Sequence, residues 1–584
     1  MKKEKKRSSF FRLMRCLGSR RVLVILICIM LILSTVADIL APRFVQKTMD
    51  GLQQGWGQSS YNWSVHGKYL LILAVLYILG GVFLGISRKT LIFVAENTVN
   101  SLREKMQKKL EVLPLNYLDT HKRGDLLARA TGDMVMLTGV LETNLPTIFT
   151  KLLTIIGTLV MMMVTNMQLS LIFFIMLPLS YCSVRIISKK TRKLFKKQQD
   201  ALGELNAHIE ENVTGSDVMR AFNYEEESYR QLEKINSRVF QTYFRSRTLS
   251  GLLNPIMNLI NNLVYIAICV FGAYSILRGN LTLGGLSAFL IYANNISGPI
   301  NQFSAMLNQV QAGLAAADRI FDLLDEEPEA PDHTDTAVLL EKTQGAVDFT
   351  HVKFGYTPEL TLMHDVNFHV EPGQVFAIVG PSGAGKTTLV NLLMRFYEID
   401  DGAICLDGHS IREMTRDGLR KFTGMVLQDT WIFTGTIFEN IAYGKPDATM
   451  EEVVGAAKKA QCDTFIRKLP DGYETMIDAE SSVLSVGEKQ LLAIARVVIA
   501  EPQILILDEA TSNIDTRTEV LITKAMNDMM KGRTTFIIAH RLFTIKNADC
   551  IIFMRDGDIL EVGNHKELME RGGYYAELYN SSYS

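Results

Sequence analysis

The sequence predicts a multi-domain chain: an all-α membrane domain of six helices with long cytoplasmic helical extensions, followed by an α/β domain with a phosphate-binding loop. Three observations predict it. Six apolar runs of membrane length lie before about residue 306. The later residues alternate between apolar and polar as in a soluble domain. A glycine-rich loop in this second half lies between a strand and a helix.

The apolar runs come first. A bilayer core of about 30 Å needs about 20 apolar residues per helix, and suitable runs lie near 22–41, 68–88, 145–164, 169–187, 252–277 and 281–305. The segments that share one side of the membrane are rich in lysine and arginine, so the positive-inside rule places them in the cytoplasm. These basic residues are Arg20, Arg21, Lys105, Lys108, Lys109, Lys189, Lys190, Arg192, Lys193, Lys196 and Lys197. We expect a multi-pass protein of the cytoplasmic membrane, with its N-terminus and second domain in the cytosol.

The first 20 residues are expected to form a cytoplasmic segment. Lys2 to Arg7 precede the first apolar run, as in a signal peptide, but that run continues past about 15 residues without a clear cleavage site, which favours an uncleaved helix. Residues 8–17 mix phenylalanine and leucine with arginine, which predicts a short helix on the inner membrane surface. An ordered tail without lipid contact is the alternative.

The domain boundaries follow from composition. We expect the membrane domain at 21–310, a linker at 311–340 that includes the polar residues 325–335, and the α/β domain at 341–584. Two cytoplasmic segments of the membrane domain show a helical apolar period, so the membrane helices should extend into the cytosol. The net charge of −1 offers no basic field for nucleic acid, and the seven scattered cysteines predict neither a disulfide framework nor a metal site.

The phosphate loop is the strongest chemical signal. Residues 380–387 fit GxxxxGK[ST], follow an apolar strand at 375–379 and precede a helix. Backbone N–H groups of such a loop face phosphate oxygens, Lys386 neutralises phosphate charge, and Thr387 ligates Mg²⁺. The residues expected at the nucleotide are Gly380, Pro381, Ser382, Gly383, Ala384, Gly385, Lys386, Thr387 and Thr388.

Two carboxylates follow a second apolar strand at 504–507. A buried parallel strand would deliver Asp508 and Glu509 to the sheet edge beside the phosphates. We expect Asp508 to bind Mg²⁺, directly or through water, and Glu509 to act as general base toward the attacking water. The alternative is a solvated acidic pair that ends a strand.

Residues 484–490 (LSVGEKQ) resemble the LSGGQ signature of ATP-binding-cassette proteins. The resemblance extends to Gln428 in its Q-loop, Asp515 in its D-loop and His540 as its switch histidine. Tyr356 falls where the family stacks an aromatic ring on adenine, whereas alone it reads as ordinary packing. The resemblance implies ATP and Mg²⁺ as cofactors, a catalytic role for Lys386, Gln428, Glu509 and His540, and Mg²⁺ contacts from Thr387, Gln428 and Asp508.

The membrane half resembles the exporter branch of the same family. Residues 113–125 and 209–222 are similar to its two coupling regions, although each alone reads as an ordinary helix and turn. The resemblance implies alternating access driven by two cassettes. ATP would lie between one cassette's phosphate loop and the signature of a second, where Ser485 and Gly487 bind the γ-phosphate.

The signature departs from the family pattern. Val486 stands where the family has glycine, and Glu488 and Lys489 replace glutamine and arginine. A side chain at 486 disturbs a close phosphate approach that glycine permits. We therefore favour a heterodimer with a second half-transporter and one weakened ATP site, and retain a homodimer with a tolerated variant signature as the alternative.

The substrate is the least determined part. A wide apolar cavity without a charged centre favours amphipathic drugs or lipids. Peptides come second, and an ATP-gated channel or regulatory membrane ATPase is a candidate of another class. The possible lining residues, each of which also reads as packing, are Met161, Met162, Met163, Tyr265, Phe271, Tyr274, Phe289 and Tyr292, with Asp38, Asn261, Asn262, Asn294 and Asn295 as polar groups at membrane depth.

Overall fold

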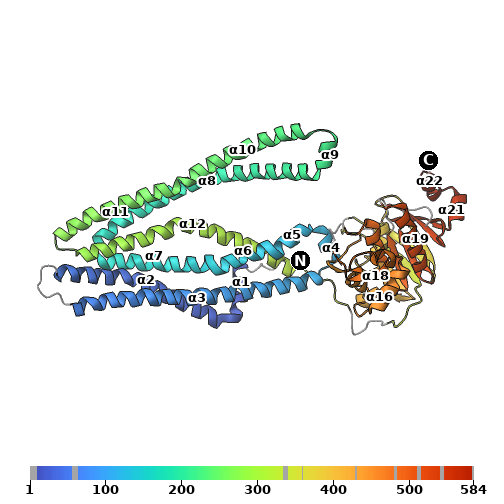
Figure 1. The fold of residues 1–584 in the computed structure, drawn as a ribbon, viewed down its shortest axis with the longest axis horizontal. Coiled ribbons are helices and arrows are strands. Elements are labelled where there is room, and N and C mark those ends of the chain that lie inside the picture. The colour runs from blue at the N-terminus through green and yellow to red at the C-terminus, as the bar shows by residue number, and fades with distance from the viewer. Residues whose placement is uncertain are drawn as a thin grey trace. The chain divides into compact units, whose positions relative to one another are not determined.

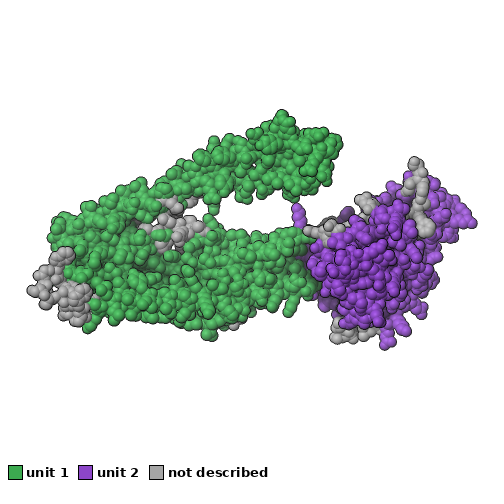
Figure 2. Space-filling view, in the orientation of Figure 1, with its two compact units in different colours: residues 1–111, 123–326 green, residues 112–122, 327–584 purple. Residues whose placement is uncertain are grey.

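The computed structural model describes residues 9–55, 63–332, 340–357, 360–427, 430–478, 483–508, 514–538 and 545–581. The chain divides into two compact units (Figure 2). Unit 1 comprises residues 1–111 and 123–326, and unit 2 comprises residues 112–122 and 327–584. A short segment between two helices of unit 1 therefore belongs to unit 2.

Unit 1 is built from α-helices (Figure 1). Each apolar run expected to cross the membrane lies in a long helix: α2, α3, α7, α8, α11 or α12. The short helix α9 joins the paired helices α8 and α10 at their common end. The helices are α1 (Ser9–Leu17), α2 (Arg21–Gly55), α3 (Trp63–Glu111), α5 (Arg123–Ala128), α6 (Met134–Gly139), α7 (Leu145–Thr165), α8 (Met167–Thr214), α9 (Ser216–Ala221), α10 (Glu225–Gly251), α11 (Leu253–Leu277) and α12 (Leu283–Asp325).

The long helices extend well beyond a bilayer. Helix α3 has 49 residues, which at about 1.5 Å per residue exceeds twice the hydrocarbon thickness. Within the described residues, four helical stretches are long and apolar enough to cross a membrane, and a shorter apolar helix covers Leu283–Ile296. The four are Arg21–Gln54, Gly67–Glu111, Arg123–Thr165 and Glu225–Leu277. The expected cytoplasmic extensions are thus present as helix.

The N-terminal helix α1 packs on the end of α12. Arg12 Nη2 donates to Asp325 Oδ1 at 2.7 Å, and its guanidinium lies over the Phe321 ring, 4.2 Å from the centroid. Phe11 on the same helix is exposed. The short helix predicted here is therefore present, with Arg12 bound to residues of α12.

Unit 2 contains two main sheets. Each residue of β9 and β10 is buried, which is typical of parallel strands covered on both faces. The antiparallel sheet has the order β2-β1-β4-β5, from β1 (Val347–Phe354), β2 (Met363–Val370), β4 (Asp401–Leu406) and β5 (His409–Ser410). The larger sheet has the order β12-β11-β3-β10-β9-β6, from β3 (Val375–Val379), β6 (Thr423–Val426), β9 (Ile504–Asp508), β10 (Thr534–Ile538), β11 (Cys550–Arg555) and β12 (Asp558–Gly563).

Helices complete unit 2. Helix α13 follows β3 directly, and α18 leads into β9, so both connect to the centre of the larger sheet. The helices of unit 2 used below are α4 (Leu115–Thr120), α13 (Lys386–Leu393), α14 (Arg416–Lys421), α16 (Met450–Lys459), α18 (Val486–Ala500), α19 (Thr516–Met530) and α21 (His565–Arg571). The α/β class expected for this half is confirmed.

Candidate functional site

The phosphate loop joins β3 to α13. A Cβ atom at Gly380 would lie 2.1 Å from the Met554 carbonyl oxygen, so only glycine allows the strand to turn here. Gly385 has φ +95, a left-handed conformation that glycine adopts readily. Helix α13 begins at the next residue, Lys386. The loop therefore presents backbone N–H groups at the N-terminus of a helix, where anions bind favourably.

Lys386 lies over this loop. Its Nζ donates to the carbonyl oxygens of Gly380 at 2.8 Å and Pro381 at 3.0 Å. Burial lowers the pKa of the Lys386 ammonium, and the nearby Asp508 carboxylate opposes that shift. The structure thus brings together Lys386, at the start of α13, and Asp508, at the end of β9.

Three neighbouring strands end beside the loop. Asp508 is the buried last residue of β9 and pairs in register with Ile538 of β10, which is parallel to β3. Glu509, His540 and Gln428 each follow β9, β10 or β6 within two residues of sequence, and all three lie outside the described residues. The carboxyl ends of parallel strands share one edge, where ligands bind in such sheets.

Tyr356 is attached to the same region. Its hydroxyl hydrogen-bonds the Thr388 Oγ1 at 2.8 Å. Its ring packs edge-on against Phe354, 5.0 Å away between centroids. Tyr356 is 42% exposed, so its side chain is hydrogen-bonded to α13 and remains accessible to a ligand.

The signature residues occupy the start of α18. Ser485 is the N-cap, and its Oγ donates to Glu488 Oε2 at 2.9 Å while Glu488 Oε2 also accepts from Ser485 N–H at 2.8 Å. This capping box stabilises the helix start. The Val486 side chain is 64% exposed, which adds an apolar surface at the position of the missing glycine.

Asp515 lies next to this helix start. It caps α19 by accepting from the N–H groups of Arg517 at 3.1 Å and Thr518 at 3.0 Å. Hydrogen bonds from Thr518 hold the pKa of Asp515 below its ordinary value. A Cβ at Gly487 would lie 2.4 Å from Thr518 Cγ2. The signature and Asp515 therefore form one cluster, carried by α18 and α19.

Tyr397, which no sequence pattern indicated, lies beside Tyr356 and contacts Asp119 of the segment that resembles the first coupling region. The Tyr397 hydroxyl donates to Asp119 of α4, and the Tyr397 ring lies edge-on to Tyr356 with centroids 5.2 Å apart. Burial, followed by the Asp119 contact, raises the pKa of Tyr397. No spacing rule links two positions 278 residues apart.

The possible cavity residues of unit 1 divide into two groups. Phe289, Tyr292 and Met162 are buried in one apolar cluster, and Tyr292 donates to the Ile39 carbonyl oxygen at 3.2 Å. These three side chains pack against other helices. Tyr265, Phe271, Tyr274 and Asp38 are exposed, as are Asn262 and Asn294, whereas Asn261 and Asn295 are partly buried.

Comparison with known proteins agrees with this architecture. The family model described as ABC transporter transmembrane region matches residues 24–300, and the model described as ABC transporter matches residues 363–512. Among solved structures, that of a bacterial Atm1-family ABC exporter with ATP bound superposes with a TM-score of 0.75 at 30% identity, covering 97% of this chain and 98% of that one.

Curated relatives match over most of their length. A fatty acid ABC transporter ATP-binding/permease protein of Mycobacterium bovis is 43% identical over 88% of this chain and 80% of the relative. The ABC transporter ATP-binding protein YfiC of Bacillus subtilis is 38% identical over 98% and 94%. A putative multidrug export ATP-binding/permease protein, YgaD, of the same species is 34% identical over 83% and 84%. Membrane-length helices joined to a cassette with these motifs place the chain in the ABC transporter family, as a multi-pass exporter-type half-transporter with a cytosolic ATPase that drives transport.

Proposed function

We propose that this half-transporter exports amphipathic small molecules, drugs or lipids, across the cytoplasmic membrane by alternating access. The observation that carries the proposal is the joining, in one chain, of long apolar helices to a complete phosphate loop. The relative named as a fatty acid transporter supports a lipid-like substrate, because fatty acids are amphipathic, and the relative named for multidrug export supports drugs. Exposed aromatic side chains on α11, such as Tyr265 and Phe271, offer apolar surface to such molecules.

The proposed catalytic roles follow the strand order. Backbone N–H groups of residues 380–388 bind the phosphates, Lys386 neutralises their charge, and Tyr356 stacks on adenine. Glu509 polarises the attacking water as general base, and Gln428 senses the γ-phosphate. His540 acts as the switch histidine of the family. Lys386, Gln428, Glu509 and His540 each follow in sequence one of the parallel strands β3, β6, β9 and β10, which end at the same edge of the larger sheet. Tyr356 follows β1 of the antiparallel sheet.

Mg²⁺ fits the residues at this edge. The Asp508 carboxylate and the Thr387 hydroxyl would supply oxygen ligands, which Mg²⁺ prefers, and Asp508 is buried at the end of β9. Gln428 would add an amide oxygen. The ion would neutralise phosphate charge there, while the chain's own residues position the nucleotide.

The altered signature supports a heterodimer. The Glu488 carboxylate accepts the hydrogen bond of the Ser485 hydroxyl. It therefore lies beside the group that we propose to bind the γ-phosphate. A carboxylate beside the proposed phosphate position disfavours the binding of an anion there. We propose that the phosphate side of this chain works at one ATP site, while its signature faces a weaker site on the partner chain.

Reconstitution tests the proposal. The purified chain, with and without the product of a neighbouring cassette gene, is placed in proteoliposomes, and ATPase activity is measured with fatty acids, amphipathic drugs and peptides. Stimulation by fatty acids or drugs is expected, and only in the presence of the partner. Stimulation by peptides alone, or hydrolysis that no substrate affects, would refute the substrate class. Full activity from this chain alone would refute the heterodimer.

A further inference from the structure

The turn that ends α13 has an unusual residue in its tightest position. The N–H of Phe396 donates to the Asn391 carbonyl at 2.9 Å and that of Arg395 to the Leu392 carbonyl at 3.0 Å, the two bonds of a Schellman turn. Glycine usually occupies the left-handed position of such a turn, yet Arg395 stands there with φ +52. A side chain is disfavoured in this conformation, so its presence calls for a compensating interaction.

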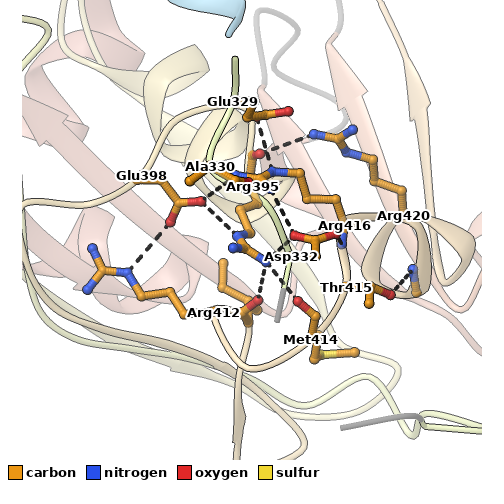
Figure 3. A network of polar contacts seen from close by, with 12 residues as sticks. Glu329, Ala330, Asp332, Arg395, Glu398, Arg412, Met414, Thr415, Arg416 and Arg420 are labelled. Carbon is orange, nitrogen blue, oxygen red and sulfur yellow. Dashed lines mark hydrogen bonds and ion pairs between the residues drawn. The ribbon is translucent and has the colours of Figure 1, made fainter. Parts of the chain in front are cut away.

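The Arg395 side chain makes that interaction. It is only 6% exposed; its Nε donates to Glu398 Oε1 at 2.9 Å, and its Nη1 donates to the Met414 carbonyl at 2.8 Å and lies 3.4 Å from Asp332 Oδ1 (Figure 3). A buried guanidinium is tolerated when it is paired in this way. Asp332 belongs to the polar linker that follows α12.

Arg416 of α14 holds the same linker. Its Nη1 donates to Asp332 Oδ1 at 2.8 Å and to the Ala330 carbonyl at 2.7 Å, and its Nη2 donates to Glu398 Oε1 at 2.9 Å. Its Nε lies 3.1 Å from Glu329 Oε1 as an ion pair. Figure 3 shows Arg395 and Arg416 converging on Asp332 and Glu398. The linker is thus bound by Arg395, just beyond the end of α13, and by Arg416 at the start of α14.

The same turn also binds α4. Tyr397 donates to Asp119 of α4, and its ring lies against Tyr356. The backbone N–H of Glu329 donates to the Val112 carbonyl at 2.8 Å, which joins the linker to the segment that leads into α4. Along the chain, α4 lies between α3 and α5, and the linker follows α12. One four-residue turn therefore contacts both segments that continue into helices of unit 1.

We propose that Arg395 and Tyr397 are positioning residues that respond to nucleotide bound at Tyr356 and α13. Through them, nucleotide alters how strongly the rest of unit 2 binds the linker at Asp332 and α4 at Asp119. The proposal rests on the placement of adenine on Tyr356. Adenine stacked on Tyr356 would restrict the motion of the Tyr356 ring. Tyr397 contacts this ring edge-on, and edge-on aromatic pairs have a preferred geometry, so the Tyr397 ring would be restricted as well. The charge-assisted bond from Tyr397 to Asp119 transmits that restriction to α4. Arg395, at the other end of α13 from the phosphate loop, transmits movement of this helix to the linker.

Hydrogen exchange tests this assignment without any transport substrate. The full chain with its partner, in lipid nanodiscs, is compared with and without Mg²⁺ and ATPγS. In the unsubstituted protein, nucleotide is expected to slow exchange in residues 115–120 and 327–332. Tyr397→Phe and Asp119→Asn should each reduce the effect in α4 by about threefold, and the double variant should lose no more than either single one. Absence of any nucleotide effect in the unsubstituted protein would overturn the proposal.

The Arg395→Gly variant distinguishes the role of the Arg395 side chain from any effect on folding. Glycine suits φ +52, so the turn should persist while the linker loses its nucleotide-dependent protection. Tyr473→Phe is the matched control, because Tyr473 donates to Asp463 at 2.7 Å in the same unit without contacting α4. Full protection in the three variants, or equal loss in Tyr473→Phe, would overturn the proposal. A failure of drugs or lipids to stimulate the ATPase would refute the proposed export and leave this measurement valid.

Discussion

Ser485 and Glu488 close the first turn of α18 through a reciprocal pair of side-chain to backbone bonds, with the Ser485 hydroxyl directed at the Glu488 carboxylate. This relationship joins helix stability to the chemistry of the signature. The bond that caps the helix also engages the hydroxyl proposed to meet phosphate.

Replacing Glu488 with Gln is expected to raise the ATPase rate of the heterodimer severalfold. The amide removes a negative charge near the proposed γ-phosphate position and still accepts the Ser485 N–H bond, so the capping box persists. Steady-state ATPase assays at saturating ATP measure the effect. Glu567→Gln, at the matching capping-box position of α21, is the control and should leave the rate unchanged. An unchanged rate in Glu488→Gln would show that its charge does not weaken the site.

Replacing Glu509 with Gln should trap ATP and reduce turnover by at least about 100-fold, because a general base is lost while the phosphate loop is intact. Nucleotide retained after rapid gel filtration, together with ATPase rate, measures both effects. Hydrolysis at the unsubstituted rate would contradict the general-base assignment.

Replacing Lys386 with Ala is expected to abolish ATP hydrolysis and weaken ATP binding. It removes the ammonium group that the loop carbonyls of Gly380 and Pro381 hold in place. Fluorescent-nucleotide titration measures the affinity. Replacing the exposed Lys531 with Ala serves as the charge-matched control, and equal losses in the two variants would argue against a specific role.

Two helical glycines should respond to alanine in opposite directions. Gly487→Ala places a Cβ 2.4 Å from Thr518 Cγ2 and should lower the free energy of unfolding by about 1–3 kcal/mol. Gly455→Ala in α16 meets no atom within 4 Å and should raise that free energy by about 0.5–1 kcal/mol. Thermal unfolding of the purified protein measures both. A stabilised Gly487→Ala variant would contradict the close packing of α18 on α19.

His369 should contribute a small pH dependence to stability. A hydrogen bond to Asp348 raises its pKa above the ordinary 6.5, so protonation is favoured in the folded state. This contribution is present below about pH 6.5 and is lost as the pH rises through the raised value. The two side chains are 49% and 37% exposed, so solvent screens the interaction and the effect is small. The midpoint of thermal unfolding should vary less between about pH 5.5 and 8.5 in His369→Gln than in the unsubstituted protein. Equal variation in the two proteins would contradict this role for His369.

Local sequence patterns predicted those helices, strands and loops whose conformation is set by a few consecutive residues. The apolar runs predicted helices at membrane depth, and the glycines with Lys386 predicted the strand, loop and helix that the structure contains. No sequence pattern predicted the π-helical turns at Arg129–Asp133 and Val140–Asn144, which interrupt the helix leading into α7. Nor did any local pattern predict that the buried Asp133 pairs with Arg319, because the two residues lie far apart in the chain.

The sequence by itself determined the membrane helices, the class of the second domain and the phosphate loop, because hydropathy period and glycine conformation act over a few consecutive residues. Only the tertiary structure decided that the turn at Arg395 meets Asp332 and that Tyr397 meets Asp119. These pairs are made when distant segments fold onto one another, and no local pattern encodes which polar side chain finds which partner.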